Sequence, residues 1–226
     1  MCGRYVLKAS TFEMQKHFHL DEVPQWTARY NIAPMQAAPI IQSIAPRKLL
    51  VAQWGLLPHW TKDVKIAHQL INARSETISA KAAFRDLLSS HRCIVPADGF
   101  YEWHREGKQR LPHFIHRGDS ALLSMAGLWS RWRSPDGLDV ETFTIITAAA
   151  NDDMKELHER MPIFFTDEQR TLWLSDTRDE AAVKELLKAP LAKQLTLTAV
   201  STHVNSVQVD DERCLEPPAT VQLRLL

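Results

Sequence analysis

The chain has 226 residues, 45% of them hydrophobic, and its 27 lysines and arginines balance 27 aspartates and glutamates to a net charge of zero. This size and composition predict one globular domain over residues 1–226, and the neutral balance counts against a strongly basic DNA-binding protein while leaving room for a local basic groove. The three cysteines are too widely spaced for a disulfide framework or a CxxC metal knuckle, so we expect a reducing, cytoplasmic setting.

The first half of the chain contains two predicted strands and one predicted helix. Apolar, β-branched and aromatic residues dominate 3–7 (GRYVL) and 48–56 (KLLVAQWGL), as is typical of strands. In 79–90 (SAKAAFRDLLSS), the apolar side chains recur at a helical spacing. No secretion signal is recognisable, and no apolar run approaches the roughly 20 residues of a membrane span, so we expect no contact with a membrane.

Five apolar runs follow between residues 92 and 149, separated by turn signals. The runs are 92–97 (RCIVPA), 100–105 (FYEWHR), 111–117 (LPHFIHR), 121–129 (ALLSMAGLW) and 141–149 (ETFTIITAA), and the turns contain Asp98-Gly99, Glu106-Gly107, Gly118-Asp119 and Pro135-Asp136-Gly137. Consecutive strands joined by short turns favour antiparallel pairing. This region therefore predicts a meander or a barrel-like sheet.

The last third is more helical. Residues 151–160 (NDDMKELHER) begin with an asparagine and two acids, as a helix N-terminus does, and end before Pro162. The segments TDEQ and TRDE are capping boxes that predict short helices beginning near Thr166 and Thr177, and 194–202 (QLTLTAVST) alternates as a strand does. The predicted fold class is α+β, a single domain whose mostly antiparallel, barrel-like sheet is flanked by helices.

Cys2 follows the first residue, in the segment MCGRY. Methionine is usually trimmed before a residue this small, and trimming would leave an α-amine of pKa near ~8 beside a thiol of pKa near ~8.5. The amine of such a 1,2-aminothiol condenses with an aldehyde to a Schiff base, and the thiol then adds to form a thiazolidine ring. An internal cysteine cannot undergo this reaction, because it has no free α-amine. The alternative is a small, buried, apolar residue at the start of a strand.

Two further segments hold candidate polar residues. In LINARSET (70–77), Asn72 can hold an amine or hydroxyl and Arg74 a phosphate or carboxylate, although spacing alone favours a strand-to-helix junction. In FYEWHR, Glu102 faces away from its aromatic neighbours. If both sides of the sheet are covered, Glu102 becomes a candidate general acid or base; the alternative is a solvent-facing glutamate.

His158 and Arg160 end the predicted helix before Pro162. A histidine there can shuttle protons near neutral pH, or it can simply balance the helix dipole. The other histidines have no cysteine or carboxylate partner at zinc-ligand spacing, so we expect no metal and no cofactor. Among the tryptophans, Trp60 follows a proline and precedes charged residues, which suits an exposed ring that stacks on a nucleobase; most of the others are expected in the core.

Eight segments, taken together and in order, resemble the SOS response-associated peptidase (SRAP) family, whose members sense abasic sites in single-stranded DNA. The segments are MCGRY, RYNIAP, QWGLLPHW, LINARSET, RCIVPADGFYEW, FTIITAAAND, LHERMP and STHVNSVQVDD. Each is weak alone, but the ordered set spans nearly the whole chain and is highly specific.

The resemblance implies roles for individual residues. The catalytic residues of this chain would be Cys2, Asn72, Glu102 and His158. Its DNA-binding residues would be Arg4, Asn31, Pro34, Trp60, Arg74 and Arg160, of which the arginines hold phosphates and Trp60 packs against bases or wedges beside the lesion. The implied activity is a covalent thiazolidine crosslink to abasic single-stranded DNA that protects the lesion in the DNA damage response, with possible autoproteolysis. We expect a monomer, although the sequence leaves the oligomeric state open.

Two departures from the family pattern bear on DNA affinity. A basic residue expected after the NARxET motif falls at Ala82, with Lys81 and Arg85 as possible substitutes, and Gln208-Val209 stands where many relatives are more basic or carry asparagine. Two rival functions remain at this point. One is an N-terminal-nucleophile amidohydrolase, since glutamine amidotransferases of that type also begin Met-Cys-Gly; the other is a non-catalytic module that binds single-stranded DNA.

Overall fold

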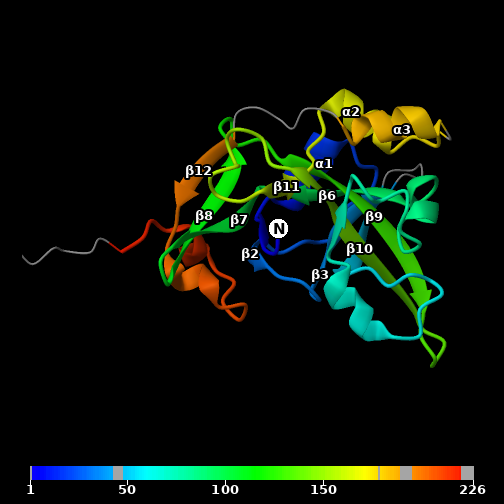
Figure 1. Cartoon of the computed structure of the whole chain (residues 1–226), viewed down its shortest axis with the longest axis horizontal. Helices are drawn as coiled ribbons and strands as arrows, with labels where there is room; N and C mark the ends of the chain where they lie inside the picture. The colour runs from blue at the N-terminus through cyan, green and yellow to red at the C-terminus, as the bar shows by residue number, and fades with distance from the viewer. Residues whose placement is uncertain (1, 43–47, 178, 189–194, 220–226) are drawn as a thin grey trace, which may run out of the picture.

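In a computed structural model, which describes residues 2–42, 48–177, 179–188 and 195–219, five strands close into a mixed barrel (Figure 1). They are β3 (Ala37–Gln42), β4 (Leu49–Trp54), β6 (Arg92–Ala97), β9 (Leu123–Arg133) and β10 (Asp139–Ala149). Neighbouring strands are antiparallel, except that β10 closes the ring by pairing in parallel with β4. The predicted α+β class with a barrel-like sheet is confirmed.

A second, antiparallel sheet lies beside the barrel. Its order is β12 (Leu195–Ala199), β8 (Gln109–Arg117), β7 (Gly99–Glu106), β1 (Tyr5–Leu7) and β2 (Arg29–Ile32). The Tyr5 ring packs edge-on against Trp54 of the barrel strand β4, with centroids 5.3 Å apart. This contact fixes the start of the chain between the two sheets.

The C-terminal half of β10 carries two short strands. β5 (Asn72–Arg74) pairs with it in parallel and β11 (Arg160–Pro162) pairs antiparallel. Thr147 lies opposite both Arg74 and Pro162. One central strand therefore brings the LINARSET and LHERMP segments together.

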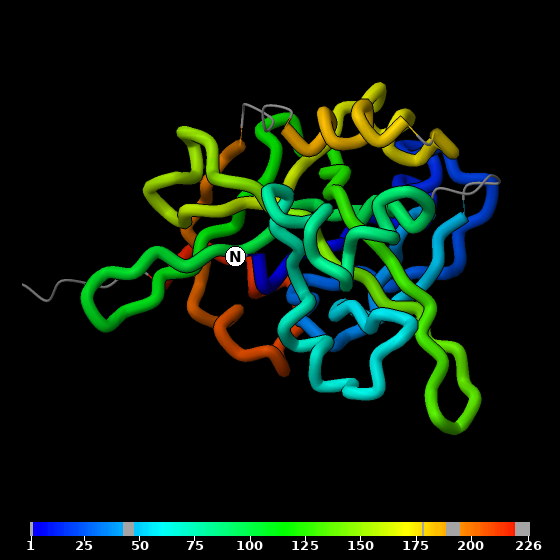
Figure 2. The backbone as a smooth tube through the Cα atoms, turned by 45° about the vertical axis from the view of Figure 1, so that its right-hand side comes forward, coloured from blue at the N-terminus to red at the C-terminus, as the bar shows by residue number. Residues whose placement is uncertain are grey.

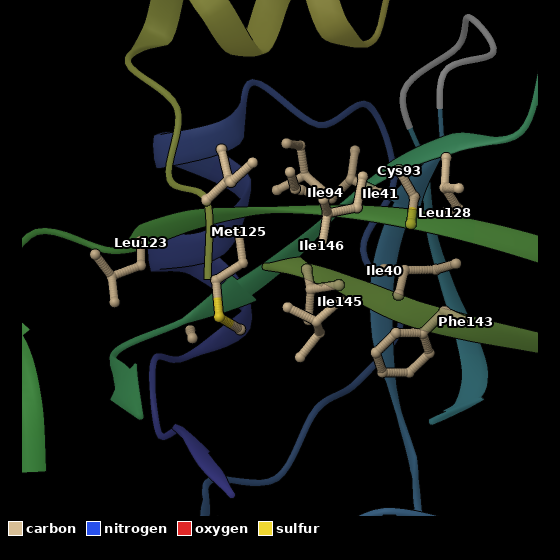
Figure 3. Close-up of a cluster of buried hydrophobic side chains, with 14 of the residues drawn as sticks. Ile40, Ile41, Cys93, Ile94, Leu123, Met125, Leu128, Phe143, Ile145 and Ile146 are labelled. Atoms are coloured by element: carbon tan, nitrogen blue, oxygen red, sulfur yellow. The ribbon is translucent and has the colours of Figure 1, made fainter. Parts of the chain in front are cut away.

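The interior of the barrel is filled by interleaved aliphatic side chains (Figure 3). Ile40 and Ile145 are fully buried there, and so is Cys93, whose thiol pKa is raised by that burial. A glycine is required at Gly127 of β9, because an added Cβ would lie 2.9 Å from Cys93 Sγ and 3.0 Å from the Thr144 carbonyl oxygen. These contacts give Cys93 a packing role.

The helices cover one side of this core. α1 (Thr11–Phe18), α2 (Asp167–Trp173) and α3 (Glu180–Leu186) lie at the top of Figure 1, and short 3₁₀ helices span Val64–Gln69, Arg85–Leu88, Thr202–Asn205 and Glu212–Leu215. α1 begins with a reciprocal capping box between Ser10 and Glu13, a signal present in the sequence that our prediction missed. No helix in the described part of the chain has the length and apolar character to cross a membrane.

Two predicted α-helices are wrong. Residues 79–90 form successive turns and the 3₁₀ helix η2 (Arg85–Leu88), with Phe84 N bonded to Lys81 O and Leu87 N to Phe84 O, three residues apart. Residues 151–160 form turns that end where the chain enters β11. In both segments, burial of a few apolar side chains outweighs helix propensity.

The turn predictions divide in two. The turns at Gly107 and Gly137, both with positive φ, do form the hairpins β7–β8 and β9–β10. The turns at Asp98 and Gly118 instead carry the chain between the two sheets, since β6 and β9 belong to the barrel and β7 and β8 to the second sheet. The capping box at Thr166 is confirmed.

The predicted start of α3 is wrong by two residues. Asp179, not Thr177, is the N-cap, and its side chain accepts hydrogen bonds from the backbone N–H groups of Ala181 and Ala182. Thr177 Oγ1 accepts a hydrogen bond from the backbone N–H of Asp179, which lies outside the helix. The strand predicted over 194–202 is present as β12, although Gln194 lies outside the described residues.

Candidate active site

Cys2 lies three residues before Tyr5, the first residue of β1, and is fully buried. Its carbonyl oxygen accepts a 2.8 Å hydrogen bond from Asn72 Nδ2, and its Sγ lies 3.9 Å from the Arg4 carbonyl oxygen. Burial raises the pKa of the Cys2 thiol well above its usual range, and the negative charge of Glu102 raises it further. The thiol therefore carries its proton at neutral pH.

Glu102 lies on β7, the strand that pairs with β1. Its side chain is only 5% exposed, although it alternates with Tyr101 and Trp103 along the strand. The sheet is thus covered on both sides here, as the sequence-based interpretation of Glu102 as a candidate acid or base required. Its negative charge acts on the Cys2 thiol, whose pKa it raises.

Asn72 begins β5 and is half-buried. While Nδ2 holds the Cys2 carbonyl, Oδ1 is buried without a hydrogen-bond partner among the described residues. A buried polar atom of this kind is costly unless something bonds to it. Asn72 therefore offers one acceptor to a group that enters beside Cys2.

His158 is half-buried just ahead of β11. The backbone N–H of Arg160 donates to His158 Nδ1 at 2.9 Å, and the Arg160 carbonyl oxygen lies 3.1 Å from the same nitrogen. A neutral ring accepts from the N–H through Nδ1 and carries its proton on Nε2, whereas a protonated ring donates to the carbonyl. Both protonation states find a partner, which suits a proton shuttle.

Arg160 is buried against Glu76 and β10. Its Nη1 and Nη2 atoms lie 3.0 and 2.9 Å from the two Glu76 carboxylate oxygens, and Nη2 also donates to Thr147 O at 2.7 Å. The Arg160 hydrogen bonds hold the pKa of the Glu76 carboxyl below its usual value. Because the Arg160 guanidinium already binds Glu76 and Thr147, we do not extend the phosphate-binding prediction to Arg160. Arg74, on the strand β5 that also pairs with β10, is exposed.

Arg4 and Asn31 form a second network. Arg4 Nη1 donates to Asn31 Oδ1 at 2.8 Å and to Val204 O at 3.0 Å, and burial lowers the Arg4 pKa. Asn31 is fully buried, and its Nδ2 donates to the carbonyl of Val209 at 2.6 Å. Asn31 thus positions Arg4 and does not itself face a groove. A backbone carbonyl supplies the contact at Val209, so the departure from the family pattern there leaves this bond intact.

The remaining predicted residues lie further along the surface. Pro34 is half-buried in the turn between β2 and β3, and Trp60 is 52% exposed. No contact that we describe joins either residue to Cys2. Ala82 is exposed, and Arg85, its suggested substitute, pairs with Asp86 at 3.1 Å.

The sequence-based prediction missed a groove beside Cys2. Gly3, Arg4, Trp103, Arg110 and Asn205 line this space of about 310 Å³. The Trp103 indole N–H donates to Asn205 Oδ1 at 2.7 Å, and the Arg4 guanidinium lies 5.8 Å from the Trp103 ring centre. Unlike Trp54, Trp129 and Trp132, Trp103 is not in the core.

A cluster that could hold a metal was also missed. His203, Asp211 and Cys214 present ligand atoms within 4.8 Å of one another. Arg213, however, donates to both Asp211 carboxylate oxygens, at 3.2 and 2.9 Å, and His203 Nε2 lies 3.1 Å from the same group. A guanidinium on the carboxylate disfavours a cation, so we interpret the cluster as a hydrogen-bond network.

Comparisons with known proteins agree on one family. A family model described as SOS response associated peptidase (SRAP) matches residues 1–207. The abasic site processing protein YoqW of Bacillus subtilis (strain 168) is 38% identical over 222 residues, which cover 96% of this chain and 99% of the relative. The abasic site processing protein HMCES of Gallus gallus is 33% identical over 234 residues, which cover 86% of this chain and 69% of the relative.

A solved structure shares the fold. The crystal structure of a protein from Bacteroides thetaiotaomicron superposes with a TM-score of 0.85 at 26% identity, covering 96% of this chain and all of the other.

Proposed function

The chain belongs to the SOS response associated peptidase (SRAP) family, and we propose that it captures abasic sites in single-stranded DNA as a covalent adduct on Cys2. Relatives named abasic site processing proteins align over nearly all of the chain, which supports the DNA lesion as substrate. The observation that carries the proposal is the setting of Cys2: a buried thiol beside Glu102, with its carbonyl held by Asn72.

The first step of the proposed reaction uses the α-amine of Cys2. Hydrolysis of the Met1–Cys2 peptide bond frees this amine. We assign that hydrolysis to the site itself or to an aminopeptidase, in line with the peptidase in the family description. The amine adds to the C1′ aldehyde of the ring-opened abasic sugar to give a carbinolamine, which loses one water to form a Schiff base. Glu102 supplies and removes the protons in these steps.

Ring closure then uses the thiol. The sulfur attacks the Schiff-base carbon, a C–S bond forms, and the thiol proton ends on the nitrogen. Because the raised pKa keeps the thiol protonated, this step requires a proton acceptor, and the Glu102 carboxylate is its charged neighbour. The balance is amine, thiol and aldehyde to thiazolidine plus one water.

The other residues position the reactants. Asn72 holds the Cys2 carbonyl and offers Oδ1 to the amine or sugar. His158 exchanges a proton with the sugar hydroxyl that is released on ring opening. Arg4 and Arg74 neutralise phosphates beside the lesion, so a local cationic site serves a protein of zero net charge.

The test uses three forms of the protein with the same abasic oligonucleotide. We expect the wild type to give an adduct that survives a denaturing gel. Cys2→Ser keeps the amine but loses the thiol, so it should give only a Schiff base that borohydride must trap. Cys2→Ala should behave likewise. Retention of denaturant-stable adduct by Cys2→Ala would refute the covalent role of the thiol, and glutaminase activity of the wild type without any adduct would favour the amidohydrolase.

A further inference from the structure

The β7–β8 hairpin extends the groove beside Cys2 away from the body of the molecule. In Figure 2, its green loop projects at the left edge, while the yellow-green β9–β10 loop projects at the lower right. The tip contains Arg105, Lys108 and Arg110, all exposed. Within the described part of the chain, no ion pair joins these three cations to a carboxylate.

The register places two of these cations, Arg105 and Arg110, on the same face as Trp103. Directly opposite residues of an antiparallel pair share a face, and so do residues two apart on one strand. Trp103 pairs with Pro112 and Arg105 with Arg110, so these four side chains lie on one face. Glu106, the acid of the tip, pairs with Gln109 and lies on the other face. Tyr101 and Phe114, the next pair inward on this face, belong to a buried cluster. The outer part of the face therefore carries positive charge and one aromatic ring.

The opposition of Arg105 and Arg110 has a cost. Like charges directly across a strand pair destabilise the sheet, and no described carboxylate offsets them. An anion bound between them would remove that repulsion. Arg110 also lines the groove of about 310 Å³ together with Gly3 and Arg4, so this face of the hairpin opens onto the residues that directly follow Cys2.

Arg4 has donors left for the same ligand. Its Nη atoms bond to Asn31, Val204 and Asn205, whereas its Nε–H makes none of the described hydrogen bonds. The guanidinium is fixed over Trp103. One cation is thus held rigidly at the Cys2 end and two lie further out on the hairpin.

We propose that Gly3, Arg4, Trp103, Arg105 and Arg110 form a subsite for the nucleotides on one side of the abasic site, with a base stacked on Trp103 and the following phosphates held between Arg105 and Arg110. This rests on the proposed function, because it takes Cys2 as the position of the lesion. It adds a path for the strand, which leaves the site along the hairpin. Since phosphates and ring stacking carry no base identity, the subsite tolerates any sequence.

The first test measures reversible binding of undamaged single-stranded oligonucleotides across a salt series. Each of Arg105→Ala and Arg110→Ala should weaken binding and reduce the slope of log affinity against log salt by about 0.7. Arg133→Ala, an exposed arginine on the opposite hairpin β9–β10, is the matched control and should bind as the wild type does. Equal slopes for the wild type, Arg105→Ala, Arg110→Ala and Arg133→Ala would overturn the subsite.

The second test asks on which side of the lesion the contact occurs. Two oligonucleotides carry a reduced abasic analogue without the aldehyde, one with nucleotides only on its 5′ side and one only on its 3′ side. The loss caused by Arg110→Ala should appear with one of them alone. An equal loss of affinity with both oligonucleotides would mean that Arg110 attracts DNA without a fixed position, and it would overturn the subsite.

The stacking contact has its own variants. Trp103→Phe keeps a ring and should bind nearly as the wild type does, while Trp103→Leu should lose roughly tenfold or more in affinity; equal binding by the two would remove Trp103 from the subsite. Adduct formation by the wild type reports the proposed function separately. A normal adduct without arginine effects refutes the subsite alone, and arginine effects without any adduct refute the covalent function alone.

Discussion

Cys2, Cys93 and Cys214 are all fully buried, so burial alone does not distinguish the reactive candidate. Burial raises the thiol pKa of each of them. Cys2 differs in having Glu102 as its charged neighbour and Asn72 on its carbonyl. Its reactivity in our account comes from the α-amine and from proton transfer, and not from a thiolate formed in advance.

Removing the charge of Glu102 tests this account of Cys2. Glu102→Gln should slow adduct formation roughly 10²- to 10⁴-fold through loss of acid–base catalysis. Because the negative charge raises the Cys2 pKa, its removal should lower that pKa, and peptide-resolved alkylation of Cys2 should begin at lower pH. Glu185→Gln, exposed on α3, is the control. An unchanged rate together with an unchanged alkylation profile would exclude Glu102.

Sequence could point to Cys2, Asn72 and Glu102 because short motifs contain them, and the structure brings these three together. It could not reveal the engaged state of Arg160 or Asn31. Arg160 bonds to Glu76, 84 positions away, and Asn31 bonds to Val209, 178 positions away. Partners at such separations depend on the fold, and no local sequence pattern predicts them.

At the scale of elements, β10 organises the site. β5 carries Asn72 and Arg74, β11 carries Arg160, and both pair with the C-terminal half of β10. The two arginines of these flanking strands nevertheless differ in burial. Arg160 is 8% exposed and paired, whereas Arg74 is exposed.

This difference predicts opposite effects of two alanine substitutions. Arg160→Ala removes hydrogen bonds to Glu76 and Thr147, so it should lower the free energy of unfolding by about 1–3 kcal/mol. Arg74→Ala should leave stability nearly unchanged and reduce the salt slope of DNA binding by about 0.7. Chemical denaturation and a salt series measure the two quantities, and the reverse pattern would contradict these assignments.

The start of α3 gives a second prediction at this scale. Asp179→Ala removes the N-cap of α3 and should cost about 1 kcal/mol, which lowers Tm by about 2–4 °C in a protein of this size. Thr177→Ala loses one bond outside the helix and should cost less. Calorimetry compares the variants, and a larger loss for Thr177→Ala would restore Thr177 as the cap.

Elements with strong local signals were predicted well, including the hairpin turns at Gly107 and Gly137 and the capping box at Thr166. The failures at 79–90 and 151–160 have a shared cause. Their apolar spacing suits a helix, but the segments connect strands and bury only a few side chains, such as Phe84 and Met154. Tertiary contacts therefore decide their conformation.

On the scale of the whole molecule, closure of the barrel depends on long-range pairing. β4 and β10 pair in parallel through Gln53–Thr142 and Trp54–Phe143. The turn signals predicted the antiparallel neighbours β7–β8 and β9–β10 correctly. They carried no signal for this parallel closure or for the alternation of the chain between two sheets, which separates β6 from β7 and β8 from β9. Both arise from how the strands pack once formed.

Close packing inside the barrel predicts that Gly127→Ala is destabilising. The new Cβ would approach the Thr144 carbonyl and Cys93 Sγ at 3.0 and 2.9 Å. Overpacking of this kind should cost about 1–3 kcal/mol. Urea unfolding with an unchanged m-value would measure it, whereas a neutral or stabilising effect would show that the barrel has room at this point.

The measurement that tests the central claim most directly is the intact mass of the protein before and after incubation with an abasic single-stranded oligonucleotide. We predict a chain that lacks Met1 and then gains the mass of the oligonucleotide less one water. The gain should resist denaturant and map to the peptide that begins at Cys2. A chain that retains Met1 and gains no mass, or an adduct that maps to another residue, would contradict the account.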